Sequence, residues 1–299
     1  MTDVLIIGAG TAGLTAAIYA RRAEKTVLVL EANSFGGQIV NTPSIENFPA
    51  APHVSGFDFA MRLYEQATAL GAEIRFEKAL ELRDGDPKTV VTAKNEYVAK
   101  TVILATGSKN RKLGLSEEER LTGRGVSYCA TCDGHFFRGK TVAVVGGGNT
   151  ALEDALYLSD MASKVYLIHR RDSFRGEEAL ANRLKEKENA EFVLNSTVTE
   201  LIAGAKLEAV RVSSADGNER VLPVDGLFVA IGRIPENQAF SPPVQLDEAG
   251  YVAAGEDCRT NVPGVFVAGD NRTKTVRQLV TAAGDGAVAA LEAVKYLNS

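Results

Sequence analysis

Cysteine, histidine and tryptophan are scarce in this sequence, whose 299 residues include three cysteines, three histidines and no tryptophan. Three cysteines are too few for a disulfide scaffold, so the composition excludes a small disulfide-rich secreted domain. An odd number of cysteines, with two of them spaced as C-x-x-C, is typical of redox chemistry in a reducing compartment. We therefore expect a cytoplasmic protein.

The sequence also lacks an excess of positive charge and a long membrane-spanning run. Lysine and arginine number 33 against 38 acidic residues, a net charge of -5, which predicts neither nucleic-acid binding nor binding to an anionic membrane. The apolar stretch Val4–Ala20 carries three glycines and follows Asp3 without a basic leader. It favours a strand, a turn and a helix over a signal peptide, and no other run is long enough for a bilayer.

What the sequence does contain is one pattern that occurs twice, in a chain long enough for two domains. The apolar run Asp3–Ile7 leads into the glycine-rich Gly8–Gly13, a helical pattern over Leu14–Arg22, and a second apolar run, Thr26–Leu30, that ends at Glu31. The same order recurs at 141–145, 146–151, a helix through Ser159, and 164–168, which ends at His169. This alternation predicts an α/β protein with two Rossmann-like dinucleotide-binding domains.

Two further strand ends predict how these domains are connected. The apolar run Thr101–Ala105 stops at Thr106 and Gly107, and Val265–Ala268 stops at Gly269 and Asp270 before an alanine-rich helix over about 279–296. Ligands of open parallel sheets bind beyond the carboxyl ends of the strands, so both stops should face a nucleotide. If the late strand rejoins the first sheet, the second domain is an insertion, with the first domain formed by 1–109 and 235–299 and the second by 110–234.

The first glycine motif, Gly8, Gly10 and Gly13, has the spacing of a dinucleotide fingerprint. Its glycines allow a tight turn, a close approach to a pyrophosphate and close packing of a helix whose N-terminal amides bind the phosphates. Glu31 supplies an acceptor for a ribose diol. A purely structural turn is the alternative, but strand, glycines, helix and acid together favour a nucleotide with a free 2′-hydroxyl.

The second motif places Gly146, Gly148 and Ala151 in the same three roles, but His169 and Arg170 follow its second strand where an acid would stand. With Arg171 and Arg175 they form a basic group suited to a 2′-phosphate. The alternative is a solvated basic loop with no ligand, which would have the same sequence pattern. The second domain is therefore expected to bind NADPH. The first could hold NAD or FAD, and FAD is the economical choice because a flavin connects hydride transfer to a dithiol.

The dithiol in question is Cys129 and Cys132, which Asp133 follows directly. Cysteines so spaced can close a small disulfide that exchanges with other thiols, whereas a zinc site would need further ligands that the chain hardly offers. Asp133 is a candidate general acid and base, or equally a turn carboxylate. His135 is expected to have a packing or surface role, and Cys258 to be a semi-buried apolar residue.

Over essentially all of its length the chain resembles the low-molecular-weight thioredoxin reductases of bacteria. The resemblance rests on short motifs at fixed places: GAGTAG at Gly8, GGQ at Gly36, ENFP at Glu46, ATG at Ala105, CATCDG at Cys129, GGGNTA at Gly146, HRRDSFR at His169, GVFVAGD at Gly264, and RQ at Arg277.

The resemblance implies two cofactor sites, a redox pair and a partner. For FAD it implies the first fingerprint and Glu31, Gly36, Gly37, Gln38, Asn47, Thr106, Gly107, Gly269, Asp270, Arg277, Gln278 and Leu279. For NADPH it implies Gly146, Gly148, Asn149, Thr150, Ala151, His169, Arg170, Arg171 and Arg175. Cys132 would face the flavin, Cys129 would attack the substrate, and Asp133 would be the acid. Such enzymes are homodimers that reduce thioredoxin or a thioredoxin-like dithiol protein, and their NADPH domain swings relative to the FAD domain.

Other functions remain open at this point. The segment Asn271–Thr275 departs from the commonest wording of the family and resembles a branch with ferredoxin-dependent members, although those lack the second fingerprint and its arginines. A related reductase could use ferredoxin as donor or serve a peroxiredoxin or glutaredoxin-like partner. A flavin-binding redox sensor without turnover is a third possibility, which the intact cysteines and arginines disfavour.

Overall fold

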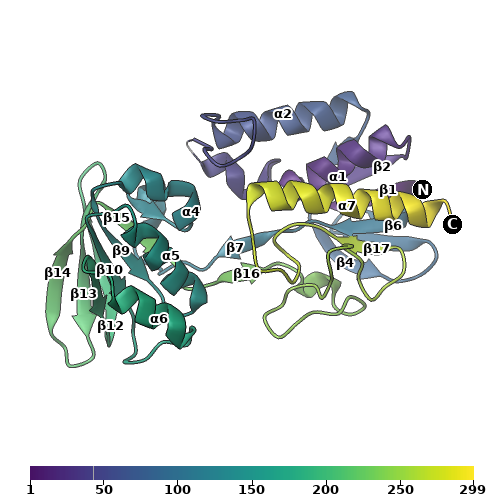
Figure 1. The fold of residues 1–299 in the computed structure, drawn as a ribbon. Coiled ribbons are helices and arrows are strands. Elements are labelled where there is room, and N and C mark those ends of the chain that lie inside the picture. Colours follow the sequence, from purple (N-terminus) through teal and green to yellow (C-terminus); the bar gives the residue numbers. More distant parts are fainter. Residues whose placement is uncertain (43) are drawn as a thin grey trace. The chain divides into compact units, whose positions relative to one another are not determined.

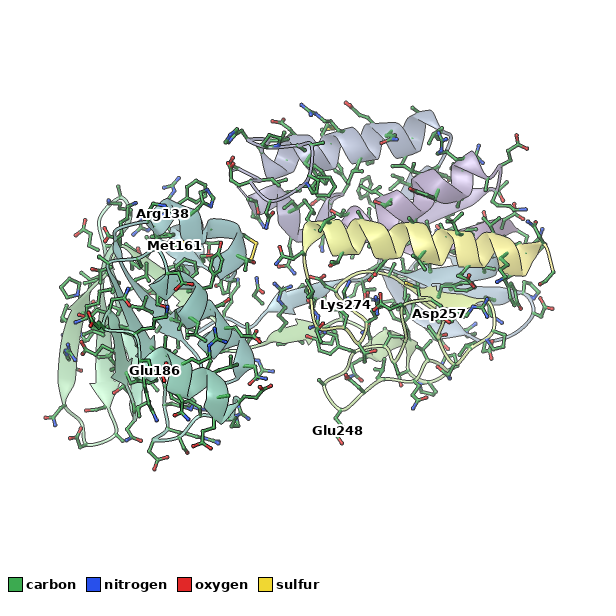
Figure 2. All side chains as sticks on the ribbon, viewed as in Figure 1. Arg138, Met161, Glu186, Glu248, Asp257 and Lys274 are labelled. Carbon is green, nitrogen blue, oxygen red and sulfur yellow. A yellow bond between two sulfur atoms is a disulfide. The ribbon has the colours of Figure 1, made fainter. Side chains whose placement is uncertain are left out.

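The structure, a computed structural model, describes residues 1–42 and 44–299 and confirms the predicted α/β class. It divides into two compact units. The first unit is formed by Met1–Lys109 and Ile234–Ser299, and the second unit, Asn110–Arg233, lies between them in the sequence. Figure 1 shows the ribbon of both units, and Figure 2 adds the side chains that fill the space between sheets and helices within each.

The sheet of the first unit has the order β3-β2-β1-β6-β5-β4, with β17 pairing to β6. Strands β1, β2, β3, β6 and β17 run parallel, whereas β4 and β5 form an antiparallel extension. The late strand thus rejoins the first sheet. The bounds are β1 Thr2–Ile7, β2 Val27–Leu30, β3 Glu73–Arg75, β4 Ala79–Arg83, β5 Lys88–Thr92, β6 Glu96–Leu104 and β17 Val265–Val267.

Both faces of this sheet are buried, which explains why β1 is apolar without alternation. Val4 and Ile6 pack toward the helices, while Leu5 and Ile7 pack toward β4, β5 and the segment around Phe240. Small side chains on α1 and α7 let these two helices lie close together over the sheet. The bounds are α1 Thr11–Arg22, α2 Gly56–Ala69 and α7 Leu279–Leu297, with short 3-10 turns η1 Gly37–Asn41 and η3 Gln238–Phe240.

The second unit repeats this layering on a parallel sheet of order β11-β10-β9-β15-β8. Val142 and Val144 of β9 pack against α5 and α6, and Ala143 and Val145 pack against an antiparallel sheet of β12, β13 and β14. The bounds are β8 Val126–Ser127, β9 Thr141–Val145, β10 Lys164–Ile168, β11 Ala190–Val193, β12 Ser196–Ala203, β13 Leu207–Ser214, β14 Glu219–Pro223, β15 Gly226–Val229, α3 Glu118–Leu121, α4 Ala130–Asp133, η2 Gly134–Phe137, α5 Asn149–Ser159 and α6 Glu178–Lys185.

The two connections between the units are short strands. They are β7 (Ser108–Asn110) and β16 (Arg233–Pro235), and they pair with each other. The two segments are extended and adjacent, so they pair because each supplies hydrogen-bond partners for the backbone amides of the other. Among residues 1–42 and 44–299, none of the helices combines the length and apolarity needed to cross a bilayer.

Candidate active site

The first glycine fingerprint connects the carboxyl end of β1 to the start of α1. Gly8 adopts φ of +110°, and a Cβ there would stand 2.3 Å from the Ala105 oxygen, so only glycine fits. A Cβ at Gly13 would stand 1.9 Å from the Gly8 oxygen, which keeps the helix close to the strand. At Gly10 the nearest atoms are 4.0 Å away. Gly8 and Gly13 are therefore in tight contact with neighbouring backbone, whereas Gly10 between them has open space beside it.

Glu31 lies at the end of β2 and is directed to this turn. Its Oε2 accepts a hydrogen bond from the Ala9 amide at 2.8 Å, and its Oε1 accepts one from the Asn33 amide at 2.9 Å. The Gly36 amide donates to the Ala9 oxygen at 2.7 Å, which brings the predicted Gly36–Gln38 segment beside the fingerprint. Gly37 and Gln38 begin the 3-10 turn η1 and are exposed.

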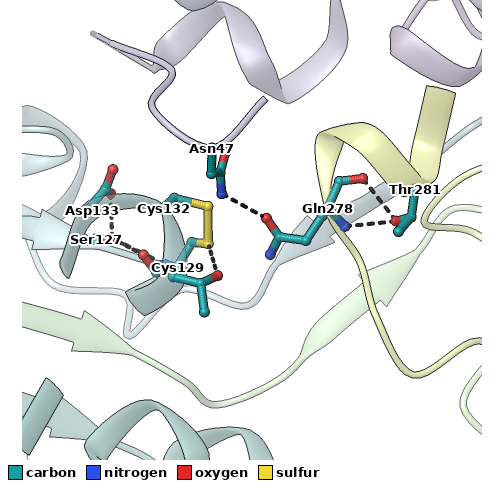
Figure 3. Close-up of a disulfide and its surroundings, with 8 residues drawn as sticks. Asn47, Ser127, Cys129, Cys132, Asp133, Gln278 and Thr281 are labelled. Atoms are coloured by element: carbon teal, nitrogen blue, oxygen red, sulfur yellow. Dashed lines mark hydrogen bonds between the residues drawn. A yellow bond between two sulfur atoms is a disulfide. The ribbon is translucent and has the colours of Figure 1, made fainter. Parts of the chain in front are cut away.

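Two other predicted segments of the first unit meet at the start of α7. Asn47 donates from Nδ2 to the Gln278 Oε1 at 3.1 Å (Figure 3), although 231 residues separate them. Gln278 and Thr281 form a capping box at this helix start, and Leu279 is its first residue. The guanidinium of Arg277 donates to the Asp270 oxygen at 3.3 Å and stacks 4.2 Å above the ring of Tyr251. Sequence reasoning missed Thr281 and Tyr251.

Positions 106, 107, 269 and 270 lie at the carboxyl ends of the neighbouring strands β6 and β17. Gly107 has φ of +68° with no atom within 4 Å of a Cβ, and Gly269 has φ of +92° with Ala12 at 2.9 Å. Thr106, Gly107, Gly269 and Asp270 thus lie at the same edge of the sheet as the first fingerprint and Glu31.

The residues of this edge fit a dinucleotide. The N-terminus of α1 has no side-chain cap and no acid in its first turn in the described chain. Its first amides are therefore available to a pyrophosphate, and the open position at Gly10 is where such a group needs room.

The second fingerprint has the same geometry between β9 and α5. A Cβ at Gly146 would stand 2.3 Å from the Ala230 oxygen, and Gly148 has open space around it. Ala151 is fully buried against Gly146, whereas Asn149 and Thr150 are exposed at the helix start. In the described chain α5 also begins without a side-chain cap or an acid in its first turn, so this edge fits a second dinucleotide.

The three predicted arginines are exposed, and Arg175 is tied to the second fingerprint through its backbone. The Arg175 amide donates to the Gly147 oxygen at 2.8 Å. Within residues 1–42 and 44–299, the guanidinium groups of Arg170, Arg171 and Arg175 have no ion-pair partner. Unpaired arginines at the carboxyl end of β10 leave their charge available to a phosphate.

His169 differs from its arginine neighbours because its ring is buried. A Cβ at Gly147 would stand 2.1 Å from the ring, which also stacks on Phe174 at a centroid distance of 5.4 Å. Burial lowers the pKa of His169, and the three arginines lower it further, so the ring is neutral at pH 7. The ring shapes the fingerprint turn by packing and adds no charge to the arginine group.

Cys129 and Cys132 form a disulfide with a Cα–Cα distance of 5.3 Å. Cys129 precedes the short helix α4, whose first turn brings the two sulfur atoms together (Figure 3). The Cys129 Sγ also lies 3.5 Å from the Thr131 hydroxyl. The pair is therefore in its oxidised form and ready to accept two electrons.

Asp133, at the end of α4, is partly buried and accepts a 2.6 Å hydrogen bond from the Ser127 hydroxyl (Figure 3). Burial raises the pKa of Asp133, and the Ser127 hydrogen bond and the nearby His135 offset only part of that rise. A carboxyl group with a raised pKa holds its proton closer to neutral pH, as a general acid requires. Ser127 was not predicted, because no local motif connects it to Asp133.

The histidine next to the cysteine pair, His135, and the remaining cysteine, Cys258, lie in very different environments. His135 is exposed and lies against Phe136 at a centroid distance of 3.8 Å. Cys258 is fully buried, and burial together with the charge of Asp285 raises its pKa to about 12. The thiol of Cys258 is thus protonated and unreactive at neutral pH.

Comparison with known proteins agrees with this arrangement. Residues 2–286 match the family described as pyridine nucleotide-disulphide oxidoreductase. A thioredoxin reductase of Listeria innocua is 45% identical over 299 residues, covering 99% of this chain and 94% of that protein. A thioredoxin reductase of Bacillus subtilis is 41% identical, covering 99% and 95%.

Solved structures of relatives share the fold. The thioredoxin reductase of Streptococcus pyogenes superposes with a TM-score of 0.95 at 40% identity, covering 100% of this chain and 98% of that one. That of Lactococcus lactis, described as being in the FR conformation, has 39% identity and covers 100% and 99%, but its TM-score is 0.69. Relatives of nearly equal identity therefore adopt more than one overall arrangement. By sequence and by fold, the chain belongs to the pyridine nucleotide-disulphide oxidoreductase family, among its thioredoxin reductases.

Proposed function

We propose that this protein catalyses the NADPH-dependent reduction of a thioredoxin disulfide, with FAD and the Cys129–Cys132 pair as its redox groups. The observation that carries the proposal is a closed C-x-x-C disulfide on the same unit as a dinucleotide fingerprint with exposed arginines. FAD and NADPH are the cofactors of this family. One relative, from Mycobacterium leprae, is named a bifunctional thioredoxin reductase/thioredoxin, so its name pairs the two activities.

The edge of the first sheet would hold FAD through the α1 amides, Glu31, Asn47 and the segments around Asp270 and Gln278. When bound, the flavin accepts a hydride and gives electrons to a disulfide. The second fingerprint would hold the NADPH pyrophosphate, with Arg170, Arg171 and Arg175 on its 2′-phosphate.

Reduction of the Cys129–Cys132 disulfide breaks one S–S bond and takes up two electrons. Two protons are needed to leave both sulfurs as thiols, and we assign the delivery of one of them to Asp133, which follows Cys132 in the chain. Because burial raises the pKa of Asp133, its carboxyl group holds a proton at higher pH than an ordinary aspartic acid, which suits this step. Ser127 holds the carboxyl through its 2.6 Å hydrogen bond and so fixes its direction.

The dithiol then reduces the partner protein by exchange. The Cys129 thiolate attacks one sulfur of the partner disulfide, so an intermolecular S–S bond forms and a partner thiolate leaves. The Cys132 thiolate next attacks the Cys129 sulfur, which releases the second partner thiolate and closes the Cys129–Cys132 disulfide. The Cys129 and Cys132 thiols each release a proton to solvent before they attack, and the two partner thiolates take up two protons from solvent or Asp133. The partner gains two electrons and this chain loses two.

Two broader proposals accompany this function. The working location is the cytoplasm, where a reducing environment suits a chain with three cysteines and a reactive pair. The working form is a homodimer, supported by the apolar side chains that α7 exposes: Val280, Val288 and Leu291 are 43%, 37% and 53% accessible.

The preference for NADPH over NADH tests the proposal. Replacing Arg170 and Arg171 by alanine removes charge-assisted hydrogen bonds worth about 1.5–3 kcal/mol each, so the KM for NADPH should rise at least about tenfold. The KM for NADH and the flavin content should stay unchanged. Steady-state reduction of thioredoxin with each donor measures both constants.

A matched control is Arg183→Ala, which removes an exposed arginine from α6 of the same unit. It should leave both KM values unchanged. Equal KM values for NADPH and NADH in the unmodified protein would refute the arginine assignment. Faster reduction of the flavin by reduced ferredoxin than by NADPH would favour the ferredoxin-dependent alternative.

A further inference from the structure

The hydroxyl group of Ser127 contacts both the acid and the cysteine pair of the second unit. Ser127 lies on β8, where it pairs with Phe228 of β15, and it is 4% exposed. Its Oγ donates to the Asp133 Oδ2 at 2.6 Å and accepts a hydrogen bond from the Cys129 amide at 3.1 Å (Figure 3). The Cys129 carbonyl oxygen lies 3.4 Å from the same Oγ. One buried hydroxyl group therefore contacts the carboxyl group of Asp133 and both backbone polar groups of Cys129.

The Ser127 hydroxyl has a single hydrogen, so it cannot donate to Asp133 and to the Cys129 oxygen at once. When Asp133 is ionised, the hydrogen points to Asp133, because a 2.6 Å bond to a carboxylate is stronger than a 3.4 Å bond to a neutral carbonyl. When Asp133 is protonated on Oδ2, the carboxyl group donates to the Ser127 Oγ instead. The hydroxyl hydrogen can then turn to the Cys129 oxygen, so the Ser127 hydroxyl has a donor and an acceptor in both states.

The Cys129 oxygen is also the acceptor at the start of helix α4. It accepts hydrogen bonds from the Cys132 amide at 3.3 Å and from the Asp133 amide at 3.1 Å. The segment that carries both sulfur atoms is thus held at the carbonyl that the Ser127 hydroxyl reaches.

Asp133 needs a hydrogen-bond partner in both protonation states because it is partly buried. Burial raises the pKa of Asp133, and the hydrogen bond from Ser127 lowers it more than the charge of His135 does. Without the hydroxyl, the carboxylate would lose this donor, and an ionised group that loses a hydrogen bond away from water is destabilised. Ser127 thus keeps Asp133 acidic enough to release its proton.

We propose that the Ser127 hydroxyl turns between Asp133 and the Cys129 oxygen as Asp133 loses and regains its proton, which makes Ser127 a positioning residue for the acid. In each cycle the carboxyl O–H bond breaks, the proton goes to a cysteine thiolate formed by reduction of the disulfide, and the carboxylate accepts the Ser127 hydrogen. A proton from solvent then restores the carboxyl group, and the Ser127 hydrogen returns to the Cys129 oxygen. The inference rests on the proposed function, in which Asp133 is the acid.

The Cys129 carbonyl can be observed by itself, because Cys129–Ala130 is the one place in the chain where alanine follows cysteine. In oxidised, flavin-loaded protein labelled with carbonyl-carbon-13 cysteine and nitrogen-15 alanine, a carbonyl–amide NMR correlation shows this carbonyl as a single signal. We expect its chemical shift to change with pH over the range in which Asp133 titrates, because the oxygen gains the Ser127 hydrogen bond as Asp133 takes up its proton. This measurement needs no substitution, so it decides the proposal even if a Ser127 variant failed to fold.

Two variants and a control sharpen the measurement. The pH-dependent change should be absent in Ser127→Ala, which lacks the hydroxyl, and in Asp133→Asn, which lacks the titrating group. It should remain in Ser159→Ala, the matched control, because Ser159 of the same unit is similarly buried and its hydroxyl donates to the Leu156 oxygen at 2.7 Å.

The other titratable groups around α4 are the same in all of these proteins. The elements packed against α4 carry His135 on η2 and Glu153, Asp154 and Tyr157 on α5, and Tyr128 precedes the cysteine pair. Burial raises the pKa of Asp154 to about 7, so Asp154 titrates in the neutral range as well. Because Asp133→Asn keeps Asp154, a change that remains in that variant does not come from Asp133.

Rapid-mixing measurements of disulfide reduction provide the second readout. In Ser127→Ala the decline in rate with rising pH should move to higher pH, and the rate below the decline should fall about tenfold, with the flavin content unchanged. Ser159→Ala should change neither. A Cys129 signal that does not change with pH in the unmodified protein, or that changes equally in Ser127→Ala, would overturn the proposal, as would an unmoved pH profile of reduction in Ser127→Ala. If the unmodified protein failed to reduce thioredoxin at all, the proposed function would fall, and the Cys129 signal would still decide whether the Ser127 hydroxyl turns.

Discussion

A buried ion cluster in the first unit gives a sharp prediction for stability. Asp285 on α7 accepts hydrogen bonds from the Arg272 guanidinium at 2.9 and 3.0 Å and from the Lys274 ammonium at 2.8 Å. The side chains of Arg272, Lys274 and Asp285 are 2%, 6% and 9% exposed, and Figure 2 labels Lys274 on the segment that leads to α7. The Gly269 amide donates to the same carboxylate at 3.0 Å.

Replacing Asp285 by asparagine keeps the shape and removes the buried counter-charge of two buried cations. Removing one partner of a buried ion pair costs about 3–5 kcal/mol, so we expect the free energy of unfolding to fall by about that amount. Chemical denaturation followed by circular dichroism measures it. The matched control is Glu256→Gln, because Glu256 contacts the same Arg272 at 3.4 Å but is 94% exposed, and its loss should cost at most about 1 kcal/mol.

The pH dependence of stability offers an independent check on the same residue. Burial alone would raise the pKa of Asp285, but the hydrogen bonds from Arg272 and Lys274 outweigh it, and the pKa lies below its ordinary value. A depressed pKa adds stability above the unfolded pKa, and this part is lost as the pH falls through the folded value. The gap between the unmodified protein and Asp285→Asn should therefore narrow in acid. Similar losses for Asp285→Asn and Glu256→Gln at neutral pH would refute the reasoning.

Two other substitutions test the redox site and the dimer. Asp133→Asn should slow disulfide reduction about 10²-fold in rapid-mixing measurements, and it should abolish the decline in rate expected as the pH rises through the pKa of Asp133. Asp160→Asn, at an exposed site, is the control and should change neither the rate nor its pH profile. If Asp133→Asn kept the unmodified pH profile, Asp133 would not be the acid. Leu291→Glu should convert the dimer into monomers, as measured by light scattering. The control is Val221→Glu, which changes another exposed apolar residue, 44% accessible on β14, and should leave the dimer intact. A dimer unaffected by Leu291→Glu would have its interface elsewhere.

The layered α/β architecture was predictable because its signals are local. Strands buried on both faces are apolar runs, as in β1 and β9, and each glycine fingerprint marks a strand-to-helix turn. The return of β17 to the first sheet also followed from a strand, a stop and a helix. The antiparallel strands β12, β13 and β14 were not predicted, and in β12 the pairing with β13 is interrupted by register shifts such as that between Val198 and Glu200.

Contacts between distant residues could not be predicted from the sequence. The hydrogen bond from Asn47 to Gln278 joins residues 231 apart, and the hydrogen bond from Thr106 to Asn237 joins residues 131 apart. His169 was grouped with the arginines by its place in the chain, whereas its buried ring packs on Gly147. Sequence patterns report which residue types follow a strand, but side-chain direction depends on what the rest of the fold places beside them.

In the proposed reaction NADPH reduces both a flavin and the Cys129–Cys132 disulfide within one chain. Anaerobic titration of the oxidised, flavin-loaded protein with NADPH, followed at the flavin absorption band and by thiol counting, tests this directly. We expect about two equivalents of NADPH per chain in the unmodified protein and about one in the double variant Cys129→Ser with Cys132→Ser, each with full flavin reduction. Equal consumption of NADPH by the two proteins, or no new thiols in the unmodified one, would show that the Cys129–Cys132 disulfide does not receive electrons from NADPH.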